Sequence, residues 1–446
     1  MDATPGSGDL FFGGRWHSWL VGGLGIGGAA IYALDVTNPS ASNFTEGNAS
    51  SIVIGEWNSG SISCTNVASC GNNLGNTFGT PQIRRLHNGN WGVIFGNGFG
   101  SASGDAGIYV MSIDSTSGAQ TFYYISTNTA GGNGIGYVTP ADLDGDHITD
   151  YVYAGDLKGN VWRFDLTSGN PSNWAAAGAP LFTTQAGQPI TSQLLVVSST
   201  INGGLPRLFI EFGTGERTQL TNLTPVQYVS GTQSIYGIWD WNLSAWNTME
   251  PGSSYSNLAA TLAATGLSSP FTLSAGNLAA QTLTPNTSTG VVDGTNVAVC
   301  WQGTATCGGT NNQFGWYANL PGASEQIIFN PVFFQGAIIV NSTIPANNVA
   351  TSCTSNLDTG FTYALAIANG GVFTNTFPSY TKNGTLITDA LEAGVETNAT
   401  GSVYVVTTTQ GTANIVYQTI SGTPGAQRLN IPSNTKAKRL TWIEHR

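Results

Sequence analysis

The residues between Tyr151 and Asp165 decide the fold class of this chain. Tyr151-Val-Tyr-Ala-Gly-Asp156 is a short apolar and aromatic run, and Asn160-Val-Trp-Arg-Phe-Asp165 is a second one, with Gly159 in the interval between them. β-Branched and aromatic residues favour strands, and a short glycine-containing interval between two such runs favours a turn. The segment therefore predicts two antiparallel strands joined by a tight turn.

The same arrangement of apolar strand, glycine-rich interval and second strand recurs at four other places. Repeated units of short strands, none of which can bury its faces alone, are typical of a β-propeller. We therefore predict an all-β fold, a β-propeller of about six to seven blades, each a four-stranded antiparallel sheet, with long loop insertions on its faces. The other copies are Trp19–Gly23 with Ala30–Asp35, Trp91–Gly98 with Gly107–Asp114, Leu208–Gly215 with Ser234–Asp240, and a weaker one at Ala337–Asn341 with Phe361–Ile367.

The spacing of these copies predicts the domain organisation. The aspartates that end the first four copies are separated by 79, 51 and 75 residues, and about 50 residues suffice for one blade, so the longer gaps carry loop insertions. The largest insertion is predicted at 242–313, with one possible short helix around Leu258–Leu267. We predict a single propeller domain over residues 1–446. Its first copy lacks an opening strand, which predicts that the chain is the C-terminal part of a larger protein.

A cluster of acidic residues directly precedes the Tyr151 strand. Asp142-Leu-Asp-Gly-Asp-His-Ile-Thr-Asp150 places carboxylates at positions 1, 3, 5 and 9 of a loop, which is the spacing of an EF-hand-like calcium loop. Position 7 of such loops contributes a backbone carbonyl, here that of Ile148. We predict a Ca²⁺ site whose ligands are Asp142, Asp144, Asp146, Ile148 and Asp150. The alternative is an exposed acidic turn without a metal.

Two positions depart from the EF-hand pattern. Position 6 is normally Gly because the turn needs a positive φ there, and His147 occupies it. His tolerates this conformation at a modest cost, so the loop can still form. Tyr153 stands at position 12 in place of the bidentate Glu, so Asp150 must complete the ligand set. A strand, not a helix, is predicted after the loop.

Composition limits the class of protein. Charged residues are only 8% of the 446, against roughly 25% in an average soluble protein, and Gly numbers 59. A surface rich in Gly, Ser, Thr and Asn is typical of extracellular bacterial β proteins. The net charge of −11 argues against nucleic acid as a partner. The sequence has no run of eighteen apolar residues, so it predicts no membrane span. The first residues do not resemble a signal peptide.

The five cysteines predict two local disulfides. Cys64 with Cys70, and Cys300 with Cys307, would each close a short loop in an oxidising compartment. Zinc is the alternative, but neither pair has Cys-x-x-Cys spacing or a histidine partner. Cys353 is left over, either as a buried thiol or as the partner of another cysteine.

Other patterns do not support catalysis. Gly23–Gly28 matches G-x-G-x-x-G, but the residues after it predict a strand where a dinucleotide site needs a helix. The four histidines are scattered, and no G-x-S-x-G motif occurs. Several charged residues that could act as catalytic acids or bases have no obvious partner and are interpreted as surface or blade-closing residues. They are Glu216 with its neighbour Arg217, Asp240 and Glu325. We predict that the protein is not an enzyme.

Taken with its flanks, the calcium loop resembles a known family. Pro140–Leu166 is similar to the signature blade of the type IV pilus tip-associated proteins, the neisserial PilC-like β-propeller family. Further segments agree in order along nearly the whole chain outside 242–313; they are Leu20–Gly25, Tyr32–Val36, Gly75–Pro81, Phe95–Gly98, Phe212–Gly215, Tyr236–Asp240, Gly315–Tyr317 and Arg439–Glu444.

This resemblance implies a function and a location. Members are large secreted proteins of the pilus tip that act in pilus biogenesis and surface adhesion, and calcium occupancy of the propeller controls pilus extension against retraction. Applied to this chain, the resemblance implies an adhesin of the type IV pilus tip (fimbrium) at the bacterial cell surface, exported through the periplasm and associated with the outer membrane. The partners would be minor pilins and a host or abiotic surface receptor.

Two other classes of protein share part of this pattern. A quinoprotein dehydrogenase has a propeller with similar strand sequences, but it would bind pyrroloquinoline quinone beside calcium. An integrin-like binding module would carry the D-x-D-G-D loop in several blades, whereas this chain has it once. Separately, the chain has no Arg-Gly-Asp tripeptide, so integrin binding through that motif has no support.

Overall fold

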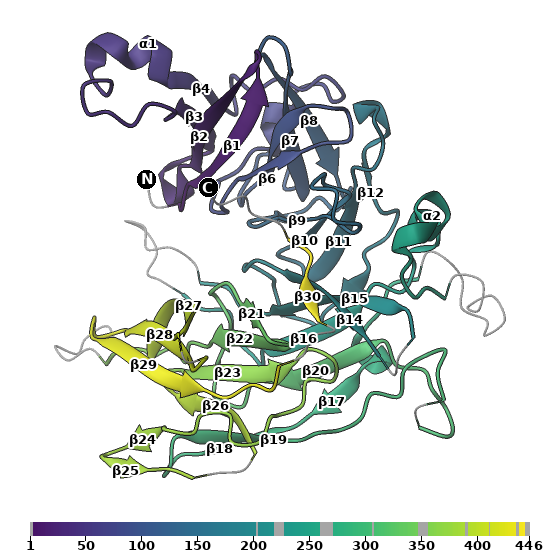
Figure 1. Cartoon of the computed structure of the whole chain (residues 1–446), viewed down its shortest axis with the longest axis vertical. Helices are drawn as coiled ribbons and strands as arrows, with labels where there is room; N and C mark the ends of the chain where they lie inside the picture. The colour runs from purple at the N-terminus through teal and green to yellow at the C-terminus, as the bar shows by residue number, and fades with distance from the viewer. Residues whose placement is uncertain are drawn as a thin grey trace. The chain divides into compact units, whose positions relative to one another are not determined.

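Figure 1 shows the computed structural model of the chain, in which strands predominate. The structure describes residues 3–201, 204–217, 227–258, 271–305, 307–346, 356–388, 391–409, 411–433 and 437–441. The chain divides into two compact units, one of Met1–Leu181 with Leu440–Arg446 and the other of Phe182–Arg439. The prediction of one propeller domain over 1–446 stays a prediction, and each unit is described by itself.

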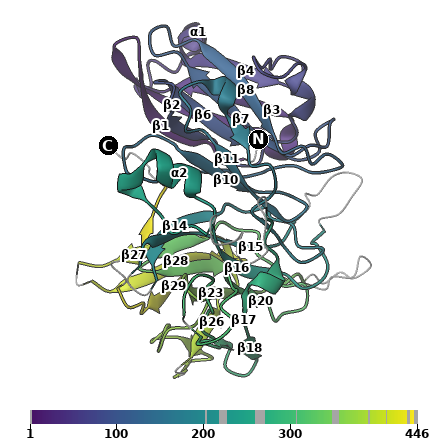
Figure 2. The same ribbon diagram turned by 90° about the vertical axis from the view of Figure 1, so that its right-hand side faces the viewer.

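The described residues of the first unit form three antiparallel sheets that follow one another along the chain. In each sheet, strands that are neighbours in sequence pair with each other, and the central strands β6 and β7 run side by side in both views (Figure 1, Figure 2). The first sheet has β1 (Gly6–Phe12), β2 (Arg15–Gly23), β3 (Ala30–Asp35) and β4 (Val53–Asn58); the second has β5 (Gln82–Arg85), β6 (Trp91–Gly96), β7 (Gly107–Ile113) and β8 (Gln120–Ser126); the third has β9 (Thr139–Ala141), β10 (Tyr151–Gly155), β11 (Asn160–Asp165) and β12 (Ala175–Ala176).

The middle sheet buries side chains on both faces. Along β6, Val93 and Phe95 belong to an apolar cluster shared with the first sheet, whereas Ile94 belongs to a cluster shared with the third. Alternate side chains of a strand point to opposite faces, so one strand can serve two cores. Sheets packed face to face in this way are the stacked blades that the repeats predict.

All five predicted repeats form antiparallel strand pairs. The pair from which the prediction began is β10 with β11, in register from Tyr151 opposite Asp165 to Gly155 opposite Val161. The remaining pairs are β2 with β3, β6 with β7, β15 with β16, and β22 with β23. The prediction of two paired strands is therefore confirmed for each copy.

The expectation that the first copy lacks an opening strand is wrong. β1 pairs with β2 along its whole length, from Gly6 opposite Val21 to Phe12 opposite Arg15. The glycines in β1 make close contacts with the second sheet: a Cβ at Gly6 would lie 2.0 Å from the carbonyl oxygen of Pro81. Glycine is depleted in strands, so this strand has a weak sequence pattern.

Among its described residues, the second unit has two six-stranded sheets, a three-stranded sheet and a two-stranded one. The three-stranded sheet packs on the second six-stranded sheet through a shared apolar cluster that includes Ile339, Val395 and Ile415. The first sheet has the order β17 (Ala279–Gln281), β20 (Gly315–Asn319), β16 (Ser234–Trp239), β15 (Pro206–Gly213), β14 (Leu195–Thr200), β30 (Lys438–Arg439); the second has β18 (Leu283–Asn286), β19 (Val291–Gly294), β26 (Glu392–Glu396), β23 (Phe361–Ala366), β22 (Ala337–Asn341), β21 (Val332–Phe334); the third has β27 (Ala399–Thr407), β28 (Ala413–Thr419), β29 (Pro424–Leu429).

The segment 242–313 does more than form a loop. Its strand β17 pairs in parallel with β20, and β19 pairs with β26, so the segment widens both six-stranded sheets beyond the four strands expected. It also contains α2 (Ser244–Met249). The possible helix around Leu258–Leu267 lies outside the described residues except for Leu258.

Helices are few and short in the described part of the chain. No helix there has the length and the apolar character needed to cross a membrane. The remaining elements are α1 (Ala49–Ile52), the 3-10 helices η1 (Gly25–Gly27), η2 (Glu46–Asn48), η3 (Cys70–Asn73), η4 (Pro171–Asn173), η5 (Pro251–Ser253) and η6 (Ala275–Asn277), and the strands β13 (Phe182–Thr183), β24 (Thr381–Lys382) and β25 (Thr385–Leu386).

Candidate metal centre

The acidic loop 142–150 joins two neighbouring strands of one sheet. β9 ends at Ala141 and β10 begins at Tyr151, and the two strands pair antiparallel with Tyr151 opposite Ala141. The loop is therefore a strand–loop–strand element, as the sequence predicts, and not a helix–loop–helix hand.

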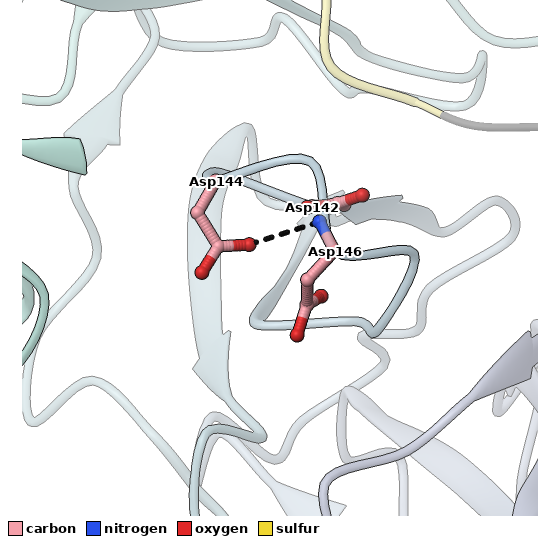
Figure 3. A group of neighbouring side chains, drawn as sticks. All are labelled: Asp142, Asp144 and Asp146. Atoms are coloured by element: carbon pink, nitrogen blue, oxygen red, sulfur yellow. Dashed lines mark hydrogen bonds between the residues drawn. The ribbon is translucent and has the colours of Figure 1, made fainter. Parts of the chain in front are cut away.

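Three of the predicted ligand residues lie together. One carboxylate oxygen from each of Asp142, Asp144 and Asp146 lies within 4.8 Å of the other two (Figure 3). Asp144 and Asp146 are exposed, and Asp142 is half-buried. Among the described residues, this is the one group of three or more His, Cys, Asp or Glu side chains whose ligand atoms come so close.

Backbone N–H groups of the loop hold these carboxylates in place. Asp142 accepts hydrogen bonds from the N–H of Gly145 at 2.6 Å and of His147 at 2.9 Å. Asp144 accepts one from the N–H of Asp146 at 3.2 Å, shown dashed in Figure 3, and Asp146 accepts one from Ile148. Each Asp thus closes a local turn of the kind that Asp side chains favour, and the side chains of alternate residues converge.

The turn at the middle of the loop has the conformation expected of position 6. His147 has φ +68°, and Gly145 has φ +87°. The prediction that position 6 adopts a positive φ is confirmed, although a residue with a Cβ occupies it. Such a residue costs the folded loop a modest amount of free energy relative to Gly.

Asp150 is not part of the group of three. It is fully buried, its Oδ1 lies 2.8 Å from His87 Nε2, and its Oδ2 accepts a 2.6 Å hydrogen bond from the N–H of Leu143. Burial raises the pKa of Asp150 to about 6, although both partners favour the charged form. Burial alone lowers the pKa of His87, but the hydrogen bond and the negative charge of Asp150 outweigh it and raise that pKa.

The ends of the loop are anchored by backbone pairing. Ile148, predicted to offer its carbonyl, forms an isolated parallel bridge with Arg85, and the Thr149 N–H donates to the Arg85 carbonyl at 3.0 Å. At the other end, the Asp142 N–H donates to the carbonyl of Leu440 at 3.1 Å. These contacts fix both ends of the loop independently of any ion.

The donor set fits a hard divalent cation. The pKa of Asp144 is raised, first by the partial loss of solvent around its carboxylate and then by the negative charges of Asp146 and Asp142, which repel it. Calcium prefers carboxylate and carbonyl oxygens, and such an ion would offset this repulsion. Asp142, Asp144 and Asp146 thus have the chemistry and proximity of a calcium ligand set, and Asp150 lies at its buried end.

The other sequence predictions on chemistry have clear outcomes. Cys64–Cys70 and Cys300–Cys307 are disulfides, and Cys353 lies outside the described residues. The strand β3 follows the Gly23–Gly28 motif, as expected of a blade turn.

Two of the three acids considered as catalytic candidates, Glu325 and Asp240, are buried. Both are fully buried, so they are not surface residues. Glu325 accepts hydrogen bonds from the Gly322 N–H and the Tyr363 hydroxyl, which ties a loop to β23. These contacts agree with the interpretation of Glu325 as a blade-closing residue.

Comparison with known proteins decides the family. The family model of the PilY1 β-propeller domain matches residues 2–261. The chain belongs to the PilY1 β-propeller family. The resemblance to the PilC-like pilus proteins and the prediction of an all-β propeller are thereby confirmed.

Several PilY1 proteins are similar in sequence. The type IV pilus biogenesis factor PilY1 of Pseudomonas aeruginosa (strain UCBPP-PA14) is 29% identical over 83% of this chain and 31% of its own length. A PilY1 homolog of Xylella fastidiosa (strain Temecula1) is 30% identical over 54% of this chain and 16% of its own length. The chain therefore spans less than a third of these relatives, which are named as pilus biogenesis factors and not as enzymes.

A solved PilY1 structure has the same fold. The crystal structure of the Pseudomonas aeruginosa PilY1 C-terminal domain superposes with a TM-score of 0.67 and 25% sequence identity. The match covers 96% of this chain and 83% of that one. The shared architecture thus extends beyond residue 261, where the match of the family model ends, through most of the second unit.

Proposed function

We propose that this chain is the calcium-binding β-propeller of a type IV pilus biogenesis factor and that it acts without catalysing a reaction. The observation that carries the proposal is the convergence of Asp142, Asp144 and Asp146 in a loop of a PilY1-family propeller. The names of the similar proteins support the role in pilus biogenesis.

Asp142, Asp144 and Asp146 would hold the ion, together with the Ile148 carbonyl and Asp150. Bound calcium supplies positive charge among carboxylates that otherwise repel one another. The chain's own contribution is to prepare the site, because four loop N–H groups already orient the three exposed or half-buried carboxylates. Binding to the folded state alone stabilises that state by linkage.

At the level of the pilus, the proposal assigns the chain to surface adhesion and to the control of extension against retraction. The partners would be minor pilins at the pilus tip and a receptor on a host or abiotic surface. The location would be extracellular, at the pilus tip and the bacterial surface. Family membership supports this assignment.

Calcium titration calorimetry tests the metal site. We expect one-to-one binding by the purified chain and none by the Asp142→Ala variant. Thermal melting with calcium and with chelator should show a higher melting temperature in calcium, and Asp146→Ala should remove the difference. Equal melting temperatures for the unchanged chain would contradict the site.

A cell assay tests the pilus role separately. The full-length protein carrying Asp142→Ala, expressed in place of the unchanged protein, should alter the number of surface pili and the attachment to a surface. Normal piliation and attachment, together with lost calcium binding, would show that the metal site is real but does not serve the pilus.

A further inference from the structure

A buried arginine without an acidic partner lies in the second unit. Arg207, on β15, is 6% exposed. Its guanidinium carbon lies 3.7 Å from the centre of the Trp239 ring and 4.9 Å from that of Trp301. The residue is therefore withdrawn from solvent, and its guanidinium lies against two aromatic rings that are nearly perpendicular to each other.

The guanidinium group has unused hydrogen-bond donors. Its Nη1 is buried and contacts no acceptor among the described residues, and no carboxylate there pairs with Arg207. Glu211, on the same face of β15, is four residues further on, or about 13 Å along the strand. Burial lowers the pKa of Arg207 to about 10, so the group still carries its charge at neutral pH.

Aromatic rings offset only part of the cost of burying this charge. A ring face attracts a cation, but it offers no lone pair to the five N–H groups of a guanidinium. A buried donor without an acceptor is expensive, and a buried charge even more so. An acceptor that carries a negative charge would offset both costs.

Arg207 lines a cavity of a size suited to a small molecule. The cavity has a volume of about 520 Å³, within the usual range for ligand sites. No other charged residue lines it. Its remaining walls are neutral and include Leu205, Ser254, Ser256, Asn257 and Gly303.

The walls of the cavity are fixed by hydrogen bonds. The Asn247 side chain donates to the Tyr255 carbonyl and accepts from the Tyr255 N–H. The Ser256 N–H donates to the Pro206 carbonyl at 3.0 Å, which ties the same segment to the start of β15. The Cys300–Cys307 disulfide closes the loop that carries Trp301 and Gly303.

We propose that this cavity binds a small organic monocarboxylate, whose carboxylate pairs with Arg207. A planar guanidinium matches a carboxylate in a bidentate pair, and a single cation matches a single negative charge. The serine and asparagine side chains suit a ligand that also carries hydroxyl or amide groups. Two sources share this chemistry: an acidic sugar and a peptide C-terminus.

Binding to the whole chain is measured by tryptophan fluorescence and calorimetry, because Trp239 and Trp301 contact Arg207. Sodium glucuronate is compared with glucose, and acetyl-alanyl-alanine with its C-terminal amide. We expect a carboxylate probe to bind and its neutral counterpart not to bind. Glucuronate binding alone assigns the site to acidic sugars, and peptide binding alone assigns it to a C-terminus.

Three variants connect binding to Arg207. Arg207→Met keeps the aliphatic stem and removes the charge, and it should weaken binding by about 10- to 100-fold. Leu205→Asp is a second test that does not depend on the folding of Arg207→Met. Leu205 is 55% exposed, so the new carboxylate stands at the cavity without disturbing the core, competes for Arg207 and should weaken binding. Arg217→Met is the control, since Arg217 is exposed and lies over Tyr228 away from this cavity.

Three results would overturn the proposal. One is no binding of either carboxylate up to about 10 mM. Another is equal binding of carboxylates and their neutral counterparts. The third is unchanged affinity in both Arg207→Met and Leu205→Asp. Calcium is first removed with chelator, and the chelator, itself a carboxylate, is dialysed away before each titration, so the outcome is independent of the calcium site.

Discussion

Asp150 Oδ1 and His87 Nε2 lie 2.8 Å apart although 63 residues separate them in the sequence. His87 follows β5 and Asp150 precedes β10, so the contact joins the second sheet of the first unit to the third. Asp150 has 1% of its side chain exposed, and His87 has 24%. The last acid of the loop 142–150 is therefore held both from outside the loop, by His87, and from within it, by the Leu143 N–H. The first three acids are held by N–H groups of the loop.

Replacing His87 by Ala should destabilise the fold, because it leaves the buried Asp150 carboxylate with one partner fewer. The loss of a hydrogen bond to a charged group costs about 1.5–3 kcal/mol. Chemical denaturation of His87→Ala, Asp150→Asn and the double variant measures the coupling. Additive effects of the two single changes would show that the contact contributes nothing to stability.

His147→Gly should tighten calcium binding by up to about 1 kcal/mol, because Gly adopts a positive φ at no steric cost. The backbone at this position already has φ +68°, so the substitution needs no rearrangement of the loop. Calorimetric titration of the variant beside the unchanged chain gives the difference. A weaker affinity would mean that the His147 side chain itself supports the site.

Reduction of both disulfides should loosen two loops and leave the sheets folded. Cys64–Cys70 and Cys300–Cys307 close separations of 6 and 7 residues, and such short loops restrict the unfolded chain by only about 2–3 kcal/mol each. Circular dichroism should retain its strand signal after reduction, while proteolysis near both loops becomes faster. Loss of the strand signal would assign the disulfides a role in the core.

Glu211→Gln should make the stability less sensitive to pH. Glu211 is fully buried, neither of its carboxylate oxygens has a partner among the described residues, and burial raises its pKa well above the usual value. The folded state therefore keeps a proton that the unfolded chain loses, so this residue's contribution to stability falls as the pH rises above about 4.5.

The measurement is denaturation in chelator at several pH values between about 4.5 and 8. The Glu211→Gln variant should lose less stability across this range than the unchanged chain. Glu46→Gln, at an exposed acid, is the control and should follow the unchanged chain. Parallel curves for Glu211→Gln and the unchanged chain would contradict the assignment.

The sequence predicts those parts of the structure that depend on neighbouring residues. Strand pairs such as β10 with β11 follow from aromatic and β-branched runs around a short turn. The positive φ at His147 follows from its place in the loop, and the two disulfides follow from the short separation of their cysteines.

Contacts between distant residues are not predictable in this way. No local pattern relates His87 to Asp150, or Arg207 to Trp301, since each pair is brought together by the packing of several strands. The β1 strand escapes prediction for a similar reason. Its glycines weaken the strand pattern, and they are there because another sheet passes too close for side chains.

The approach of Gly6 to Pro81 limits how this protein can vary. The obstacle to a side chain at position 6 is a carbonyl oxygen of the main chain, which cannot rotate aside as a side chain would. At Gly178, in contrast, a Cβ would meet no heavy atom within 4 Å, and the backbone has no positive φ. In a library of random substitutions, position 178 should accept most residues and position 6 almost none. Over evolutionary time, position 6, at the junction of the first two sheets, should therefore remain glycine, whereas position 178 can change to other residues.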